Sequence, residues 1–215
     1  LYAEALQIWQ LAIEQGAVTP MTYYYMGWIG DTEAFKEAEK YASDYCFPNR
    51  AEASLALKAA LSAFEGEADA TLGSKANYYL GCLYYDKRQY ELAIGYWQNS
   101  AAKDAQFPTV RRNLALAEFN KLHEEDTALV HMEKAFALDT TDARILMELD
   151  QLYKRMGKAH ADRLANLQNY PELIAKRDDL LLEKITLLNQ TGKYEEAMKK
   201  LDAHQFHPWE GGEGK

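Results

Sequence analysis

Apolar residues recur at spacings of three and four through most of the chain, which is the pattern of amphipathic α-helices. The strict alternation that is typical of strands does not occur. We therefore predict an all-α protein of about 12 antiparallel helices. The predicted ranges are 2–15, 20–30, 32–45, 50–64, 74–87, 90–104, 109–121, 125–138, 142–156, 159–169, 173–190 and 194–204.

Proline and glycine mark the breaks between these segments. Gly16 and Pro20 separate the first two predicted helices, and Pro108 opens the seventh. Pro171 is expected to end the tenth helix, and Gly192 has the position of a C-cap residue.

The segment 77–100 carries the most specific pattern, since it reads as two short helices joined by a turn at 86–89. Small residues at Gly81 and Ala93 allow the two helices to approach closely. Large residues fill the space around them: Leu80, Tyr84, Tyr90 and Trp97. This arrangement resembles a tetratricopeptide repeat, a helix–turn–helix unit of about 34 residues that stacks with copies of itself.

The repeat can be followed by the small residue of each second helix. Ala128 lies 35 residues after Ala93, and Ala197 lies 69 after Ala128, with Ala161 or Leu164 expected between them. We therefore predict an α-α superhelix, a tetratricopeptide-like solenoid. The predicted helix 50–64 falls outside the simple period.

Further motifs strengthen a family resemblance. Together they are similar to the C-terminal tetratricopeptide region of large bacterial proteins with an N-terminal domain of unknown function. The resemblance implies that this chain is part of a longer protein. The motifs are Tyr45-Cys-Phe-Pro-Asn-Arg50, Tyr78-Tyr-Leu-Gly81, Arg112-Asn-Leu114, Asp142-Ala-Arg144, Glu148-Leu-Asp-Gln-Leu-Tyr153, Arg177-Asp-Asp-Leu180 and Phe206-His-Pro-Trp-Glu-Gly-Gly-Glu-Gly214.

Composition and charge narrow the classes of function. We expect one helical domain over 1–204 and a polar, Gly-rich tail over 205–215. The net charge of −9 disfavours nucleic acid as a partner. No apolar run approaches the length of a membrane span, and two cysteines do not make a disulfide framework. The compartment stays open, with the cytoplasm favoured.

Candidate binding residues come from the first helices of the repeats, which line the concave face of a tetratricopeptide stack. They are Tyr84, Arg112, Asn113, Arg144, Glu148, Asp179 and Glu183. Arg112 and Arg144 could offer forked donors to a carboxylate of a partner. Alternatively, Arg–carboxylate pairs between neighbouring repeats simply hold the stack together.

The tail offers a second set of candidates. Trp209 and Glu210 could enter a site, because Trp stacks on sugar rings or proline and Glu can serve in acid–base chemistry. A loosely held chain end is the alternative. His204 and His207 are three residues apart, and apart from Glu210 no third ligand is evident nearby, so we predict no metal site.

These observations favour a non-catalytic, protein-binding scaffold without cofactor. The expected partner is a peptide or the N-terminal domain of the same parent protein, and a homodimer through exposed solenoid ends is a further expectation. The alternative is an accessory helical domain of a bacterial carbohydrate-active enzyme, whose tail completes a site on the missing domain.

Overall fold

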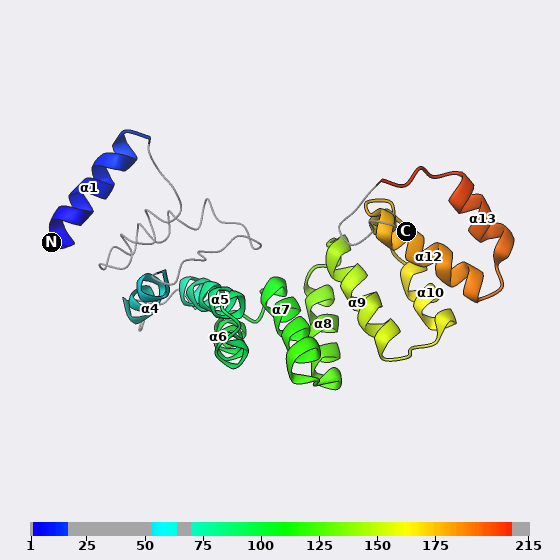
Figure 1. Cartoon of the computed structure of the whole chain (residues 1–215), viewed down its shortest axis with the longest axis horizontal. Coiled ribbons are helices and arrows are strands. Elements are labelled where there is room, and N and C mark those ends of the chain that lie inside the picture. Colours follow the sequence, from blue (N-terminus) through cyan, green and yellow to red (C-terminus); the bar gives the residue numbers. More distant parts are fainter. Residues whose placement is uncertain (1, 17–52, 64–69, 208–215) are drawn as a thin grey trace. The chain divides into compact units, whose positions relative to one another are not determined.

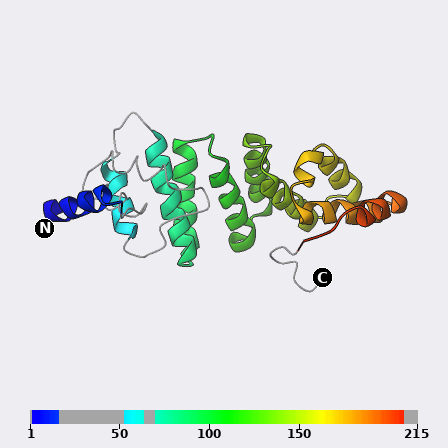
Figure 2. The ribbon, with the colours of Figure 1, turned by 90° about the horizontal axis from the view of Figure 1, so that it is seen from above.

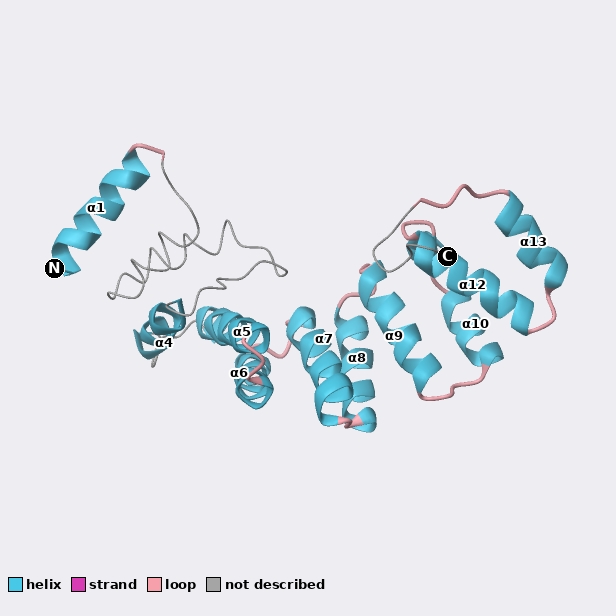
Figure 3. Ribbon diagram, in the orientation of Figure 1, coloured by secondary structure: helices cyan, strands magenta, loops and turns pink. Residues whose placement is uncertain are grey.

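The described part of the chain folds into helices and short loops, with no strand among residues 2–16, 53–63 and 70–207 (Figure 3). These are the residues that the computed structural model describes. The chain forms two compact units, 1–122 and 123–215. The prediction of an all-α protein is confirmed.

Figure 1 labels most helices of both units, but not η1 and α11. The first unit contains α1 (Tyr2–Glu14), α4 (Ala53–Ala63), α5 (Ala70–Asp86), α6 (Tyr90–Lys103), α7 (Pro108–Ala117) and the π-helix η1 (Glu118–Leu122). The second contains α8 (Glu125–Leu138), α9 (Ala143–Arg155), α10 (His160–Gln168), α11 (Pro171–Ile174), α12 (Asp178–Gln190) and α13 (Tyr194–Asp202).

Most predicted ranges within the described residues agree with these helices, and the exceptions are 173–190 and the end of 109–121. The predicted helices 20–30 and 32–45 lie outside the described residues. The prediction of one helix over 173–190 is wrong, because α11 and α12 are separate. Arg177 has an extended backbone, with φ −141° and ψ 121°, and two acidic residues follow in the first turn of α12. Acidic side chains are favoured at that end of a helix, so a new helix begins there.

The core of the first unit forms where α5 and α6 lie side by side (Figures 1 and 2). A Cβ atom added at Gly81 would lie 2.3 Å from both Cδ1 and Nε1 of Trp97. The indole Nε1 donates a hydrogen bond of 3.2 Å to the carbonyl of Tyr78. The close approach predicted at Gly81 is therefore present, and Trp97 fills the space that the missing side chain leaves.

Left-handed backbone turns recur along the chain with the period of the repeat. One residue after each first helix has a positive φ, and these residues follow one another at intervals of 34 or 35. They are Arg88 (59°), His123 (59°), Gly157 (75°) and Gly192 (79°). A left-handed residue at this position closes a helix by bonding its last carbonyls. The predicted C-cap at Gly192 is confirmed.

The small position of the second helices is kept in three repeats and replaced in one. Ala93, Ala128 and Ala197 are buried. Between them, the expected Ala161 is exposed, so that assignment is wrong, whereas Leu164 is buried. The residue that keeps the spacing is Arg163, which lies 35 positions after Ala128 and is only 1% exposed.

The first helix between Ala93 and Ala128 ends in a turn that is wider than an α-helical turn. The predicted helix 109–121 is an α-helix up to Ala117 and then continues as η1. A π-helical turn takes up one more residue than an α-helical turn, as single-residue insertions do. The step from Ala128 to Arg163 is also 35 residues long and contains no π-helix, so the π-helical turn is a local feature of this repeat.

Candidate functional site

The candidates of the first unit are engaged in packing. Tyr84 is half-buried and stacks on Tyr96 with ring centroids 5.4 Å apart and an interplanar angle of 3°. Arg112 is buried, and its Nη1 donates to Asn113 Oδ1 over 3.0 Å. Asn113 Nδ2 in turn approaches Cys82 Sγ at 3.8 Å, which links α7 to α5. The contacts of Tyr84 and Asn113 therefore join neighbouring helices of the unit, and Arg112 bonds Asn113 within α7.

The candidates of the second unit belong to two parallel rows of polar residues. Four residues of α9 and four of α12 recur at spacings i, i+4, i+7 and i+11, which places each row on one helix face. We call these eight residues the α9–α12 polar face. They are Arg144, Glu148, Gln151 and Arg155 on α9, and Asp179, Glu183, Thr186 and Gln190 on α12.

Hydrogen bonds tie the two rows together. Gln151 Nε2 donates to Glu183 Oε2 over 3.4 Å. Lys154, at the edge of the α9 row, donates from Nζ to both oxygens of Glu183, over 3.0 and 3.1 Å. Along α9, Arg144 Nε lies 3.4 Å from Glu148 Oε1, and the Arg144 side chain stays exposed. The rows are thus adjacent, and Glu183 is the residue that joins them.

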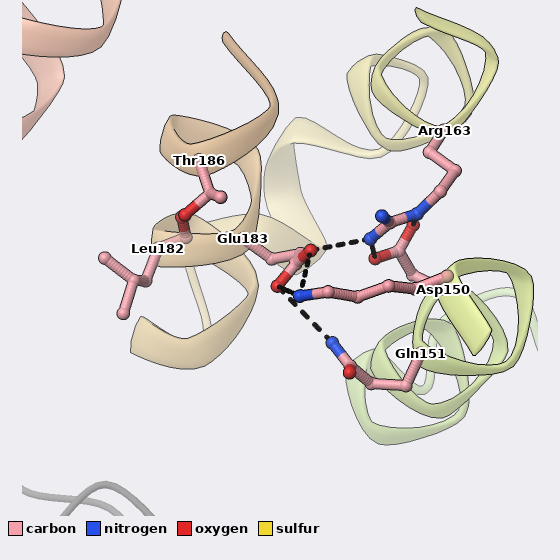
Figure 4. A network of polar contacts seen from close by, with 7 residues as sticks. Asp150, Gln151, Arg163, Leu182, Glu183 and Thr186 are labelled. Atoms are coloured by element: carbon pink, nitrogen blue, oxygen red, sulfur yellow. Dashed lines mark hydrogen bonds and ion pairs between the residues drawn. The ribbon is translucent and has the colours of Figure 1, made fainter. Parts of the chain in front are cut away.

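Beneath this face lies a buried ionic network (Figure 4). Arg163 of α10 donates from Nε and Nη2 to the two oxygens of Asp150 on α9, over 3.1 and 2.5 Å. The same Nη2 donates to Glu183 Oε1 over 2.6 Å. One guanidinium therefore connects α9, α10 and α12, at the position where other repeats place an alanine.

The environment shifts the pKa values of these groups. Burial raises the pKa of Asp150, against the opposing effect of Arg163. Burial also disfavours the charge of Glu183, but the hydrogen bonds from Arg163 and Lys154 outweigh it and lower the Glu183 pKa. Glu183 therefore remains ionised at neutral pH, and its charge is balanced within the network.

A second ionic group lies at the start of α12. Arg177 donates from Nε and Nη2 to the two oxygens of Asp179, over 2.9 and 2.5 Å. This hydrogen bonding raises the pKa of Arg177, and the charges of Glu148 and Asp142 on the α9 side act in the same direction. Asp179 is therefore held by its own helix start, while Glu148 lies near the same guanidinium.

The described part of the tail is bound to α12. His204 Nε2 lies 2.7 Å from Asp178 Oδ1, and the backbone N–H of His207 donates to Asp178 Oδ2 over 2.6 Å. Among the described residues, no three His, Cys, Asp or Glu side chains are grouped as metal ligands. Trp209 and Glu210 lie outside the described residues. His204 and His207 therefore hold the described part of the tail against the first turn of α12.

Sequence reasoning finds four members of the polar face and misses the residues that organise it. It identifies Glu183 as a partner-binding candidate, but it identifies neither its buried partner Arg163 nor Asp150, which bonds the same guanidinium. Gln151 and Lys154 are missed as well, although Gln151 continues the spacing of Arg144 and Glu148. That helical period is the signal that could have found it.

Comparison with solved structures identifies the fold. MamA matches with a TM-score of 0.56 and 20% identity over 85% of this chain and 88% of that chain. YrrB, described as a TPR protein with an unusual peptide-binding site, matches with a TM-score of 0.55 and 16% identity, over 90% and 89%. The C-terminal part of a TPR repeat-containing protein from Cytophaga hutchinsonii matches with 0.54 and 21%, over 94% and 75%.

No family model matches the chain. The likeness to these structures nevertheless agrees with the 34- to 35-residue spacing of the turns. The chain therefore has the tetratricopeptide-type helical-repeat fold, as the sequence predicts. No described helix combines the length and the apolar character that crossing a membrane requires.

Proposed function

We propose that this chain, which has a tetratricopeptide-type fold, is a non-catalytic protein-binding scaffold. Its α9–α12 polar face binds an extended peptide segment. The supporting observation is the pair of polar rows on adjacent first helices, joined through Glu183. Extended peptides suit such a face, because their side chains and backbone groups recur along the direction in which the helices are stacked.

The face offers two kinds of contact. Gln151, Thr186 and Gln190 carry neutral groups that can bond the backbone amides and carbonyls of a peptide. Arg144 and Arg155 are exposed cations at either end of the α9 row. A guanidinium prefers a carboxylate in forked geometry. We therefore expect a ligand with an Asp, a Glu or a free C-terminus near one end.

The network beneath the face serves this function by fixing the side chains in place. Glu183 accepts from Arg163, Lys154 and Gln151, so its charge is satisfied before any ligand arrives. A side chain that is already held loses little conformational freedom on binding. The segment bound could come from another protein or from the N-terminal domain of the parent protein that the sequence motifs imply.

The proposal can be tested with peptides selected from a displayed library of random dodecamers. Calorimetric titration of the selected peptide into the wild-type chain gives the reference Kd. Arg144→Glu should raise this Kd by about tenfold or more, corresponding to about 1.4 kcal/mol, because a ligand carboxylate then faces a like charge.

Lys134→Glu is the matched control. It makes the same change of charge at an exposed position of α8, in the same unit and outside the polar face. Its Kd should equal that of the wild-type chain. If both variants raise the Kd equally, the effect comes from the net charge of the chain and not from the polar face. If Arg144→Glu leaves the Kd unchanged, Arg144 does not contact the peptide.

A further inference from the structure

The last described helix, α13, carries an apolar row that faces solvent. Tyr194 is 63% exposed, Met198 54% and Leu201 41%. Their spacing of four and three residues places them on one side of the helix. We call these three residues the α13 stripe. Single exposed apolar residues are common, but three in one row on a nine-residue helix form a continuous surface.

The equivalent row in the first unit is covered. Tyr90, Ile94 and Trp97 of α6 have the same positions relative to Ala93 as the α13 stripe has relative to Ala197. Ile94 and Trp97 are buried in one cluster with residues of the following segment, and Tyr90 is half-buried. Trp97 and Tyr90 also contact Tyr85 of α5, and Lys121 lies over the Tyr90 ring. In the first unit, the elements on both sides of α6 therefore cover this row.

The charges of α13 indicate what kind of helix would fit. The first turn contains Glu195 and Glu196, and the last turn contains Lys199 and Lys200. Glu195 and Lys199 lie on the same flank of the stripe, at about 100° and 140° from Tyr194 at 100° per residue. An antiparallel helix with the same order of charges along its own chain, glutamate before lysine, would place its lysine against Glu195 and its glutamate against Lys199.

The helix that meets this requirement is α13 itself. We propose that the α13 stripe pairs with the α13 stripe of a second copy of this chain, antiparallel and related by a two-fold axis. Such an interface is isologous, so each Glu195 faces Lys199 of the other copy and the contact occurs twice. The apolar side chains of both stripes meet in the centre, between the charged pairs.

Three side chains per copy make a small interface. Stable complexes commonly bury about 1,200–2,000 Å² in total, and smaller interfaces belong to weak or transient associations. We therefore expect a dimer that forms as the concentration of the chain rises and dissociates on dilution. The charged pairs lie at the rim, so the association should weaken as salt is added.

Sedimentation equilibrium over a series of concentrations, from micromolar to millimolar, tests the proposal. The average mass of the wild-type chain should rise from that of a monomer towards that of a dimer. Met198→Glu should keep the monomer mass throughout, because it places two carboxylates at the centre of the interface. Val130→Glu is the control, since Val130 is 64% exposed on α8, outside the stripe, and it should dimerise like the wild type.

Charge exchange tests the antiparallel arrangement. Glu195→Lys alone should raise the dimer dissociation constant several-fold, because the introduced lysine then faces Lys199 of the other copy. The double variant Glu195→Lys, Lys199→Glu should restore it, since the exchange recreates both pairs. A double variant as weak as the single one would overturn the arrangement.

Two further outcomes would overturn the proposal as a whole. One is a monomer at every concentration. The other is dimerisation of a chain shortened after residue 207 when the full chain stays monomeric, which would mean that the chain's own tail covers the stripe. Circular dichroism of every variant shows whether a loss of association is accompanied by a loss of helix.

Discussion

At the scale of single residues, the close packing of the first unit depends on a hydrogen atom at Gly81. The indole of Trp97 occupies the space that any Cβ would need, and it is held there by its bond to the carbonyl of Tyr78. The obstacle is a rigid ring within the core and not the end of a flexible chain, so it cannot move aside cheaply.

Gly81→Ala should therefore lower the free energy of unfolding by about 1–3 kcal/mol through overpacking. Gly95→Ala is the control, because Gly95 lies in α6 and a Cβ there would meet nothing within 4 Å. That substitution should be neutral or stabilising by about 0.5–1 kcal/mol, since alanine favours a helix. Urea unfolding of both variants measures the difference, and equal stabilities would refute the packing described at Gly81.

Arg163 shows where residue-level reading of the sequence fails. Arginine is seldom buried, so the sequence alone favours an exposed position for it. Its burial depends on Asp150 and Glu183, which lie 13 and 20 residues away. No local sequence pattern predicts a contact among three helices. The repeat that contains Arg163 therefore looks degenerate in the sequence, although its spacing is kept.

Arg163→Met should cost about 3–5 kcal/mol of stability, because it leaves Asp150 buried without its partner. The double variant Asp150→Leu, Arg163→Met should cost clearly less than the sum of the two single variants, since it removes both charges. A double-mutant cycle from denaturant unfolding gives the coupling energy. Additive costs would contradict the ionic contact.

The pH dependence of stability reports on Glu183. Its pKa in the folded chain lies below the ordinary value of 4.5, so its contribution to stability is present above that value. The contribution is lost as the pH falls through the lowered folded pKa. The stability difference between the wild type and Glu183→Gln should therefore be largest near neutral pH and shrink in acid. A difference that does not depend on pH would mean that the Glu183 charge is not stabilised by folding.

At the scale of elements, the turns define the repeat more clearly than the helices do. Gly192 is predicted from the sequence as a C-cap and Gly157 is a glycine in the same conformation, whereas Arg88 and His123 adopt it without being glycine. The amide after each of three of these residues bonds a carbonyl five residues earlier. These bonds are Gln89 N to Tyr84 O (2.9 Å), Lys158 N to Tyr153 O (3.0 Å) and Lys193 N to Leu188 O (2.8 Å).

A left-handed backbone costs about 1–2 kcal/mol at a residue that is not glycine. Arg88→Gly should therefore raise the unfolding free energy by about 1 kcal/mol. Gly157→Ala should lower it by a similar amount, because it introduces a Cβ at a φ of 75°. Thermal unfolding measures both shifts, and a destabilised Arg88→Gly would contradict the conformation of that turn.

Two departures from the predicted elements have local causes. The segment 173–190 is apolar enough to read as one helix, but the extended backbone of Arg177 and its bonds to Asp179 divide it. The segment 109–121 keeps its helical period while its last turn widens to π. Hydrophobic spacing predicts that a helix is present. It does not show where an α-helix changes to a π-helix or where one extended residue divides it.

At the scale of the whole molecule, the sequence predicts the architecture well because the same pattern of small and turn residues occurs in several repeats. Even with one degenerate copy, the remaining spacing of small residues and turn residues identifies the fold. The candidate site is harder to predict. The sequence places polar residues on the first helices. Only the folded structure shows that Arg112 is buried and Arg144 is exposed.

The central claim is that the α9–α12 polar face binds an extended peptide. The most direct measurement is a pair of amide NMR spectra of the full chain, recorded with and without a peptide selected from the random library. We predict peak shifts concentrated on residues of α9 and α12, above all Arg144, Gln151 and Thr186. In Arg144→Glu, the same shifts should require about tenfold more peptide. Shifts confined to helices of the first unit, or no shifts at a peptide concentration that saturates binding, would contradict the claim.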